Sequence, residues 1–304
     1  MILVALAIVA STVVGVAAER RWGAGALQAT KWIVRALLWT VMPFVAFVTI
    51  NRLDLGGGVG GGLALAWVVA LVVGLLAWIA SRALDLPAPT SGALIVSTIV
   101  ANTGYLGIPL CAALLGSDAI GPAVAYDVLV NTLLFLTVGF AIGAGMGTKA
   151  GETAAERVKS FVVRNPPLVA VILALVLPHD LAPEVLHDVV ELLVFIVLPV
   201  GFFIVGVTLS SEAEEGIKVF PPPLTRPVLV VVGLRLAIAP AAMFGLSALA
   251  FDVPDAYIVE AGMATGVNAL VVGHAYGLDL RLTSGAVAWT TAVVVAAAVG
   301  VALV

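Results

Sequence analysis

Long apolar runs, separated by short polar or Gly/Pro-rich breaks, follow one another along the whole chain. A helix needs roughly 17 to 25 predominantly apolar residues to cross a hydrocarbon core of about 30 Å. The pattern therefore predicts an all-α integral membrane protein of ten transmembrane helices, with little mass outside the bilayer. The predicted spans are residues 1–18, 31–50, 61–80, 92–115, 121–145, 165–178, 189–209, 227–250, 256–275 and 282–303.

The composition strengthens the membrane interpretation. Hydrophobic residues make up 62% of the chain and charged residues 11%, with a mean hydropathy of +1.20, whereas a soluble domain carries roughly 25% charged residues. No basic run is present, so a nucleic-acid partner is not expected. The single cysteine, Cys111, excludes an internal disulfide, and its place in an apolar run predicts a small buried side chain.

Basic residues are concentrated at alternate breaks between the spans. Only Arg52 lies at a break on the opposite side, and Arg235 lies inside a span. Because Lys and Arg accumulate in cytoplasmic loops, we expect a cell-membrane protein with both termini extracellular and the 146–164 loop in the cytoplasm. No positive residue precedes the stretch 1–18, which predicts a retained span rather than a cleaved signal peptide. The basic residues at the alternate breaks are Arg20, Arg21, Lys31, Arg35, Arg82, Lys149, Arg157, Lys159, Arg164, Lys218, Arg226 and Arg281.

Four features recur in the same order in the two halves of the chain, at offsets of 156, 162, 161 and 159 residues. Matches in order at a nearly constant offset indicate duplication. With five spans in each half the repeats have opposite orientations, which is typical of transporters. We predict a first repeat at 1–145, the loop 146–164 and a second repeat at 165–304. The matched features are Pro43 and Pro199, Thr103-Gly104 and Thr265-Gly266, Gly116-Ser117-Asp118 and Gly277-Leu278-Asp279, and Asn131-Thr132 and Thr290-Thr291.

Polar and glycine residues interrupt the fourth and ninth spans about ten residues from their starts, at 101–109 and 264–268. At 1.5 Å per residue this is about 15 Å deep, near the bilayer midplane. Non-helical backbone at that depth survives only when it is buried in protein or lines a cavity. Pro109 is well placed as the first residue of a second half-helix. Two broken helices would direct positive dipole ends at the centre, a setting suited to an anion, whereas the alternative is a kink that serves packing only.

Two ionisable residues lie well inside spans, where such groups are functional candidates. Asp127 lies one turn before Asn131, so the two share a helix face that could line a cavity. Asp127 either carries a proton or cation, or is a carboxylate that is hydrogen-bonded to neighbouring helix ends. Arg235 either pairs with a substrate carboxylate or an acidic residue, or snorkels to the cytoplasmic headgroups.

Other titratable residues are expected to have structural roles. Glu260 and Glu191, near the outer ends of their spans, are predicted to be interfacial, and His274 a buried, hydrogen-bonded histidine. The pairs His179-Asp180 and His187-Asp188 lack a fixed ligand spacing, which favours a solvated polar loop over a metal site. We therefore expect no metal and no cofactor, and the coupling ion, a proton or sodium if there is one, stays open.

The segment Asn102-Thr103-Gly104-Tyr105-Leu106-Gly107-Ile108-Pro109, followed by Gly116, resembles the fourth-span motif of the auxin efflux carrier family. This family includes plant PIN-FORMED carriers and bacterial malate permeases. The segments Met263–Leu270 and Ala275–Asp279 look like the second crossover of the family, although neither Ala264 nor Thr265 is the proline usual there. The resemblance covers the whole chain.

The resemblance implies a fold like that of sodium/proton antiporters and bile-acid symporters. Spans 1, 2, 6 and 7 would form a scaffold domain, able to pair in a homodimer, and spans 3–5 and 8–10 a transport domain that moves like an elevator. The implied substrates are small organic anions, either auxin-like monocarboxylates or malate-like dicarboxylates. The substrate-binding residues expected from the resemblance and the break are Asn102, Thr103, Gly104, Tyr105, Pro109, Asn131, Thr265, Gly266 and Asn268.

Other classes of function fit the residues less well. The chain has no H-E-x-x-H or G-x-S-x-G motif, so we do not expect an enzyme. A receptor would not need symmetric breaks, and an inverted repeat favours a carrier over a channel. The alternative within transporters is a sodium-coupled symporter of the bile-acid type, to which Asn102, Thr103, Thr265 and Asn268 could supply oxygen ligands. The identity of the anion, the direction of transport and the oligomeric state stay open.

Overall fold

The computed structural model describes residues 2–53, 56, 58–149, 166–178, 181–214, 222–250 and 252–302. Within these ranges the chain is helical apart from short connections and one isolated pair of bridged residues, Ala101 and Thr265, so the all-α prediction is confirmed. Among the residues that the structure describes, six helices are long and apolar enough to cross a membrane, and three shorter helices are apolar. The protein is therefore a multi-pass membrane protein.

Helices cover every predicted apolar run of the first half. The elements, in which η marks a π- or 3₁₀-helix, are α1 (Ile2–Trp22), α2 (Ala24–Ala36), η1 (Leu37–Val41), α3 (Met42–Asn51), α4 (Gly58–Ala83), α5 (Ala88–Ile99), η2 (Thr103–Gly107), α6 (Ile108–Leu115), η3 (Ser117–Ala119), α7 (Ile120–Tyr126), η4 (Asp127–Thr132), η5 (Phe135–Gly139) and α8 (Phe140–Met146).

The second half also contains long helices on either side of a broken one. Of the predicted loop 146–164, only residues 146–149 lie within the described part of the chain. The elements are α10 (Pro166–Val176), α11 (Val185–Glu214), α12 (Arg226–Gly233), η6 (Leu234–Ile238), α13 (Ala239–Ala250), α14 (Asp255–Ala261), α15 (Asn268–Tyr276) and α16 (Leu280–Ala302).

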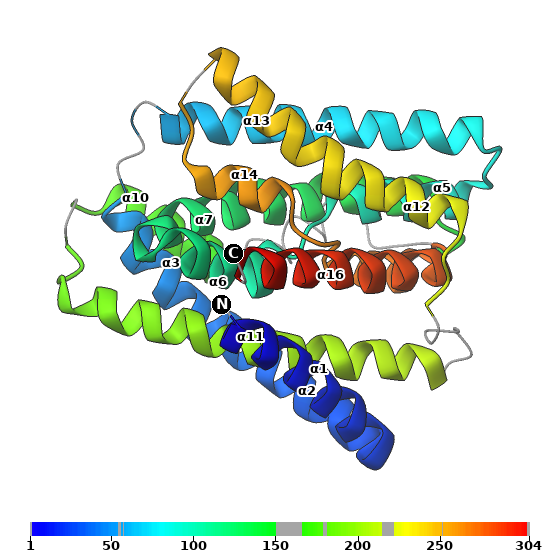
Figure 1. Ribbon diagram of the computed structural model, residues 1–304, viewed down its shortest axis with the longest axis horizontal. Coiled ribbons are helices and arrows are strands. Elements are labelled where there is room, and N and C mark those ends of the chain that lie inside the picture. The colour runs from blue at the N-terminus through cyan, green and yellow to red at the C-terminus, as the bar shows by residue number, and fades with distance from the viewer. Residues whose placement is uncertain are drawn as a thin grey trace.

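The long helices run between two ends of the molecule, where the connections gather (Figure 1). The ends of α3, α10 and α13 and the starts of α4, α11 and α14 lie toward the left end in this view, and the α4–α5 turn and the starts of α12 and α16 lie at the right end. Basic residues follow the same division. Arg82 ends α4 and Arg226 begins α12 at the right end, whereas Arg52 follows α3 at the left.

Small residues and one buried amide join the helices α1, α3, α10 and α11. Gly15 lets α1 pack closely along α11, because an added Cβ there would lie 3.0 Å from the backbone N of Val207. Asn51 at the end of α3 donates to the carbonyls of Ala174 (3.1 Å) and Pro178 (3.0 Å) beside α10. These contacts join α1 to α11 and α3 to α10. The helices α1, α2 and α11 lie at the lower side of Figure 1, and α4 and α13 lie at the upper side.

Three π-helical turns, η2, η4 and η6, lie beside the broken region in the middle of the molecule. π-helical turns are rare and occur mostly as single turns inside α-helices, frequently at functional sites. At η2 the sequence offers a reason, because Pro109 has no N–H for an α-type bond to the carbonyl four residues earlier. The wider turn before it, in which the Gly107 N–H reaches the Asn102 carbonyl at 3.0 Å, accommodates that missing donor.

Candidate functional site

The two helix breaks run antiparallel past each other in the interior of the protein. The N–H of Asn102 donates to the carbonyl of Ala264 at 2.8 Å, and the N–H of Gly266 donates to the carbonyl of Val100 at 3.0 Å. Gly266 is required by this approach, because an added Cβ would lie only 2.8 Å from the carbonyl carbon of Ala101. The polar segments predicted to interrupt the two spans therefore do so, and they meet.

Buried side chains satisfy the backbone groups that the breaks leave without helical partners. Asn131 accepts from the Ala101 N–H at 2.8 Å and donates to the Ala101 carbonyl at 3.0 Å. At the other break, the hydroxyl of Thr290 accepts from the Thr265 N–H at 2.9 Å, and the hydroxyl of Thr265 donates to the Ser97 carbonyl at 2.8 Å. Each break is thus held by a polar side chain from the following span, as buried backbone polar groups require.

Arg235 of η6 binds both breaks at their carbonyl ends. Its Nε donates to the Met263 carbonyl at 2.9 Å and its Nη1 to the Thr98 carbonyl at 3.1 Å, and the residue is only 4% exposed. Of the alternatives predicted for Arg235, snorkelling to the headgroups is excluded by this burial. The carbonyl groups at a helix C-terminus carry partial negative charge and have no intrahelical donors, so they provide acceptors for a guanidinium at this depth.

Asp127, Thr103 and Asn131 form a hydrogen-bonded chain at the start of the helix that follows the first break. The Thr103 hydroxyl donates to Asp127 Oδ1, and Asn131 Nδ2 donates to the Thr103 hydroxyl at 2.7 Å. Asp127 and Asn131 therefore share a face, as their spacing predicts. An added Cβ on Gly104 would lie 3.2 Å from Asp127 Oδ2, which places this carboxylate against a helix N-terminus, where backbone dipoles favour negative charge.

The sequence predicts that Pro109 is the first residue of the second half-helix, but the structure shows that it is not. Helical structure resumes at Thr103, in the π turn η2, and Pro109 is the second residue of α6. The prediction is wrong because a π turn tolerates the missing donor of Pro109, so the helix can begin six residues earlier. The effective N-terminus of this half-helix is therefore the stretch that contains Thr103 and Gly104.

The remaining predicted site residues occupy different surroundings. Asn102 is buried, and its side-chain amide makes no hydrogen bond to any other residue that the structure describes. Tyr105 is half-buried and packs against Gly201 of α11, where an added Cβ would lie 2.7 Å from the Tyr105 Cβ. Asn268 is exposed at the first position of α15. The breaks thus bring together most of the predicted residues, with Tyr105 directed at α11 and Asn268 at the edge.

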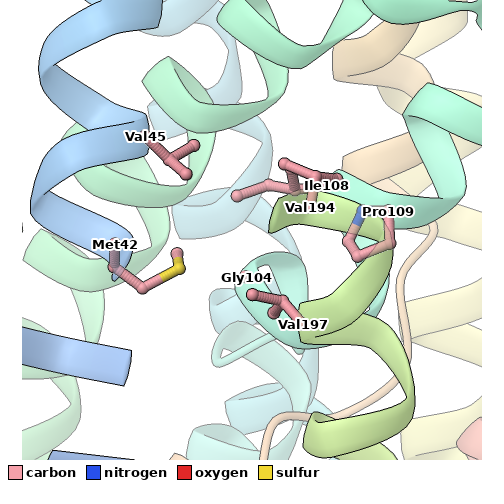
Figure 2. Close-up of a pocket in the computed structure, with 7 residues that line it drawn as sticks. All are labelled: Met42, Val45, Gly104, Ile108, Pro109, Val194 and Val197. Atoms are coloured by element: carbon pink, nitrogen blue, oxygen red, sulfur yellow. The ribbon is translucent and has the colours of Figure 1, made fainter. Parts of the chain in front are cut away.

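A small apolar cavity lies where the half-helix of η2 and α6 faces α3 and α11 (Figure 2). The cavity has room for about one water molecule, which is too little for an organic anion. The walls of the cavity are apolar, and Gly104 is the lining residue that lies nearest to the break. The lining residues are Met42, Val45, Gly104, Ile108, Pro109, Val194 and Val197.

Glu260 of α14 is a buried acidic residue for which the sequence predicts the wrong surroundings. The predicted place is the membrane interface, but the residue is 0% exposed. The reason is that α14 ends at Ala261, so Glu260 lies at the inner end of a half-helix. An added Cβ on Gly107 would overlap its carboxylate, and Cys111, buried as predicted, has its Sγ 3.8 Å from Oε1. An acidic residue two positions before a glycine break is the signal in the sequence that could have found it.

The histidines and the other acidic residues that the sequence singles out, where the structure describes them, lie on different elements from the breaks. His187 and Asp188 lie in the first turn of α11, and the pair His179-Asp180 lies outside the described residues. His274 is half-buried rather than buried, and its carbonyl accepts a bond from Lys149 Nζ at 3.3 Å. Among the described residues, no group of three or more His, Cys, Asp or Glu side chains is close enough to hold a metal ion.

Comparisons with known proteins identify the family of the chain. A family model described as "Membrane transport protein" matches residues 6–300. An uncharacterized transporter of Methanothermobacter thermautotrophicus is 27% identical over 274 residues, covering 84% of this chain and 83% of that protein. An uncharacterized transporter of Methanocaldococcus jannaschii is 24% identical over 270 residues, with the same coverage of 84% and 83%. The chain belongs to this family of membrane transport proteins, the auxin efflux carrier family that its two break motifs resemble.

Proposed function

We propose that the protein is a secondary active carrier of small organic anions, which binds its substrate at the two helix breaks. The observation that carries the proposal is the antiparallel meeting of the breaks at Ala101 and Thr265, with buried polar side chains around them. Broken helices at the membrane midplane are the usual substrate sites of transporters that are built from inverted repeats. The family and the relatives are transporters, which also fits the expectation that the chain is not an enzyme.

Corresponding bonds at the two breaks support a pair of inverted five-span repeats, ten spans in all. Asn131 binds the backbone of Ala101, and Thr290 binds the backbone of Thr265. Asn131 and Thr290 are 159 residues apart and are matched by the sequence alone. If the two halves were unrelated, there would be no reason for each break to be held by a side chain from the next span along the chain.

An organic anion fits the chemistry around the breaks better than a neutral or cationic substrate. The half-helices that begin at Thr103 and Asn268 direct the positive ends of their dipoles toward the broken region. The unused amide of Asn102 is a donor for a carboxylate, and the apolar cavity beside Gly104 suits an apolar substrate body. Asp127 already neutralises part of the positive dipole charge at the half-helix that begins at Thr103, so the substrate carboxylate would approach from the Asn102 side.

An elevator motion accounts for a site that is closed in this structure. The cavity lies between α3 and α11 on one side and η2 and α6 on the other. We propose that α1–α3, α10 and α11 form the scaffold domain, through which two copies pair, and that the remaining helices move as the transport domain. Sliding of the two domains would enlarge the cavity alternately toward each side of the membrane. The basic ends of α4, α12 and α16 would face the cytoplasm.

Uptake into proteoliposomes tests the proposal. Radiolabelled malate and indole-3-acetate are offered to wild type, to Asn102→Ala and to Thr137→Ala, a matched control. Thr137 is exposed, and its hydroxyl donates only to Leu133 of its own helix. We expect saturable uptake of at least one anion by wild type and by the control, and loss of that uptake in Asn102→Ala. Uptake of neither anion, or an unaffected Asn102→Ala, would contradict the substrate class or the site.

The same assay distinguishes a carrier that does not need sodium from the alternative, a sodium-coupled symporter. A sodium site needs several oxygen ligands, whereas the hydroxyl oxygen of Thr103 already accepts a hydrogen bond from Asn131 Nδ2, and Asn268 lies exposed at the edge of the site. We therefore expect uptake to continue when sodium is replaced by choline on both sides of the membrane. Uptake that stops without sodium would favour the symporter.

A further inference from the structure

We propose that Glu260 carries a proton through the transport cycle and couples its binding to that of the anion. This inference rests on the proposed function and adds a driving ion to it. Glu260 lies on α14, directly behind the half-helix whose N-terminus is the proposed anion site. Its carboxylate is in contact with Gly107, three residues after Gly104 on the same half-helix. The two buried carboxyl groups, Asp127 and Glu260, therefore flank the start of one helix.

The two carboxyl groups differ in how well their charge is compensated. Asp127 accepts a hydrogen bond from Thr103, which is itself held by Asn131. Glu260 is 0% exposed, and its Oε2 has no hydrogen-bond partner among the described residues. Its Oε1 has only the Cys111 thiol, a weak donor, at 3.8 Å. An ionised carboxylate in such surroundings is far more costly than a protonated one, so Glu260 is the group that takes the proton.

The groups near Glu260 do not offer a stronger partner for its charge. Arg235 donates to two backbone carbonyls, and no ion pair joins it to Glu260 in the described chain. The elements packed against α14 are α4, α6, α7, α13 and η2, and η4 and η6 adjoin them. The titratable or charged side chains that these elements present near the middle of the molecule are Tyr105, Cys111, Tyr126, Asp127 and Arg235.

A proton fits this site better than a metal cation. Sodium needs several hard oxygen ligands, whereas the contacts that the structure shows for the Glu260 carboxyl are with Gly107, which has no side chain, and with the Cys111 thiol. A proton needs one oxygen atom. In the cycle, the carboxylate of Glu260 accepts a proton from water to form the O–H bond, and that bond breaks again when the proton returns to water on the other side.

Coupling follows from the position of Glu260 behind the anion site. A negative charge on Glu260 repels a carboxylate bound at the N-terminus of η2, and a neutral Glu260 does not. Protonation and anion binding therefore favour each other, and by reciprocity each raises the affinity for the other. As the pH rises and Glu260 loses its proton, the affinity for the anion falls. The carrier would move the proton and the anion in the same direction.

Infrared spectroscopy tests the proton site without any substrate. Wild type, Glu260→Gln and Glu191→Gln are titrated in lipid, and the C=O stretch of a protonated carboxyl is followed. Glu191 is a matched control because it is half-exposed on α11, away from the breaks. We expect a titrating carboxyl band in wild type and in Glu191→Gln that is missing from Glu260→Gln. Identical spectra of all three proteins would overturn the proposal, even if the protein proves to be a carrier.

Binding and proton uptake test the coupling. The anion used is whichever of malate and indole-3-acetate the wild type transports. We expect the Kd of this anion to rise with pH by up to about tenfold per pH unit, the limit for one linked proton. Glu260→Gln, permanently neutral, should keep a Kd near the low-pH value of wild type at every pH. Wild type should also take up protons from a weakly buffered solution when the anion is added. Wild-type binding that is independent of pH, without proton uptake, would overturn the coupling. Binding of neither anion would contradict the proposed function, and the infrared result would then decide the proton site on its own.

Discussion

Asn131 makes three hydrogen bonds at the first break, to both backbone groups of Ala101 and to the hydroxyl of Thr103. Neither alanine nor water can replace them easily, because Asn131 is only 4% exposed. Asn131 therefore holds the backbone immediately before Asn102. Of the predicted substrate-binding residues, Asn102 has the clearest free donor.

Replacing Asn131 with alanine should destabilise the protein. Each buried polar group left without a partner costs about 1–3 kcal/mol, and Ala101 would lose the partners of both its N–H and its carbonyl. We expect a lower thermal midpoint in detergent than for Thr137→Ala, the exposed control. Equal midpoints would show that the break does not depend on Asn131.

Gly266→Ala should be damaging although it adds only one carbon. The added Cβ would lie 2.8 Å from the carbonyl carbon of Ala101, and the rigid backbone on both sides leaves no easy escape. Overpacking of this kind costs about 1–3 kcal/mol. Gly245→Ala is the matched control, since an added Cβ there has no neighbour within 4 Å. Stability and uptake should fall in the first variant and stay near wild type in the second, and a harmless Gly266→Ala would contradict the close meeting of the breaks.

At the scale of elements, the apolar pattern located the helices well, because burial in lipid demands long apolar runs regardless of tertiary detail. The breaks were also foreseen, since glycine and polar residues at the depth of the midplane indicate backbone that is buried in protein or lines a cavity. The start of the half-helix at Thr103 was missed because local rules favour proline at a helix start and do not describe π turns. Glu260 was misplaced because its depth depends on where α14 ends, and Arg235 because its carbonyl partners belong to distant segments.

Arg235→Lys tests whether η6 holds the two breaks together. A lysine ammonium lacks the fork of donors with which Arg235 reaches Met263 and Thr98. One carbonyl should lose its partner, lowering stability by about 1–3 kcal/mol, while the Kd of the anion changes less than about tenfold, the equivalent of 1.4 kcal/mol. Arg226→Lys, at the exposed start of α12, is the control. A larger change in Kd with unaltered stability would instead assign Arg235 to the substrate.

At the scale of the whole molecule, the cavity marks a boundary between α3 and α11 on one side and the half-helix of η2 and α6 on the other. Tyr105 and Gly201 touch across the same boundary, so the two sides are closely fitted in this structure. A cavity with room for about one water molecule must widen before an anion can enter. Movement of one side against the other is therefore a requirement of the proposed site, and the sequence foresaw it only through the family resemblance.

Joining the two sides should stop transport. Val45 of α3 and Ile108 of α6 line the same small cavity, so cysteines at both positions lie within reach of a short bifunctional maleimide. We expect uptake to fall in proportion to the cross-linked fraction, and each variant with one introduced cysteine, which also retains the buried Cys111, to remain active after the same treatment. Full activity of completely cross-linked protein would exclude relative movement at this boundary.

Trans-stimulation in proteoliposomes tests the central claim, that the breaks form the site of an alternating-access carrier. Labelled malate or indole-3-acetate is added outside vesicles that contain wild type and either no anion or an excess of the same unlabelled anion. A carrier that returns faster when loaded should take up label more quickly into the preloaded vesicles, and Asn102→Ala should lose this acceleration. Uptake that is rapid but indifferent to the internal anion, in wild type and variant alike, would indicate a pore and contradict the account.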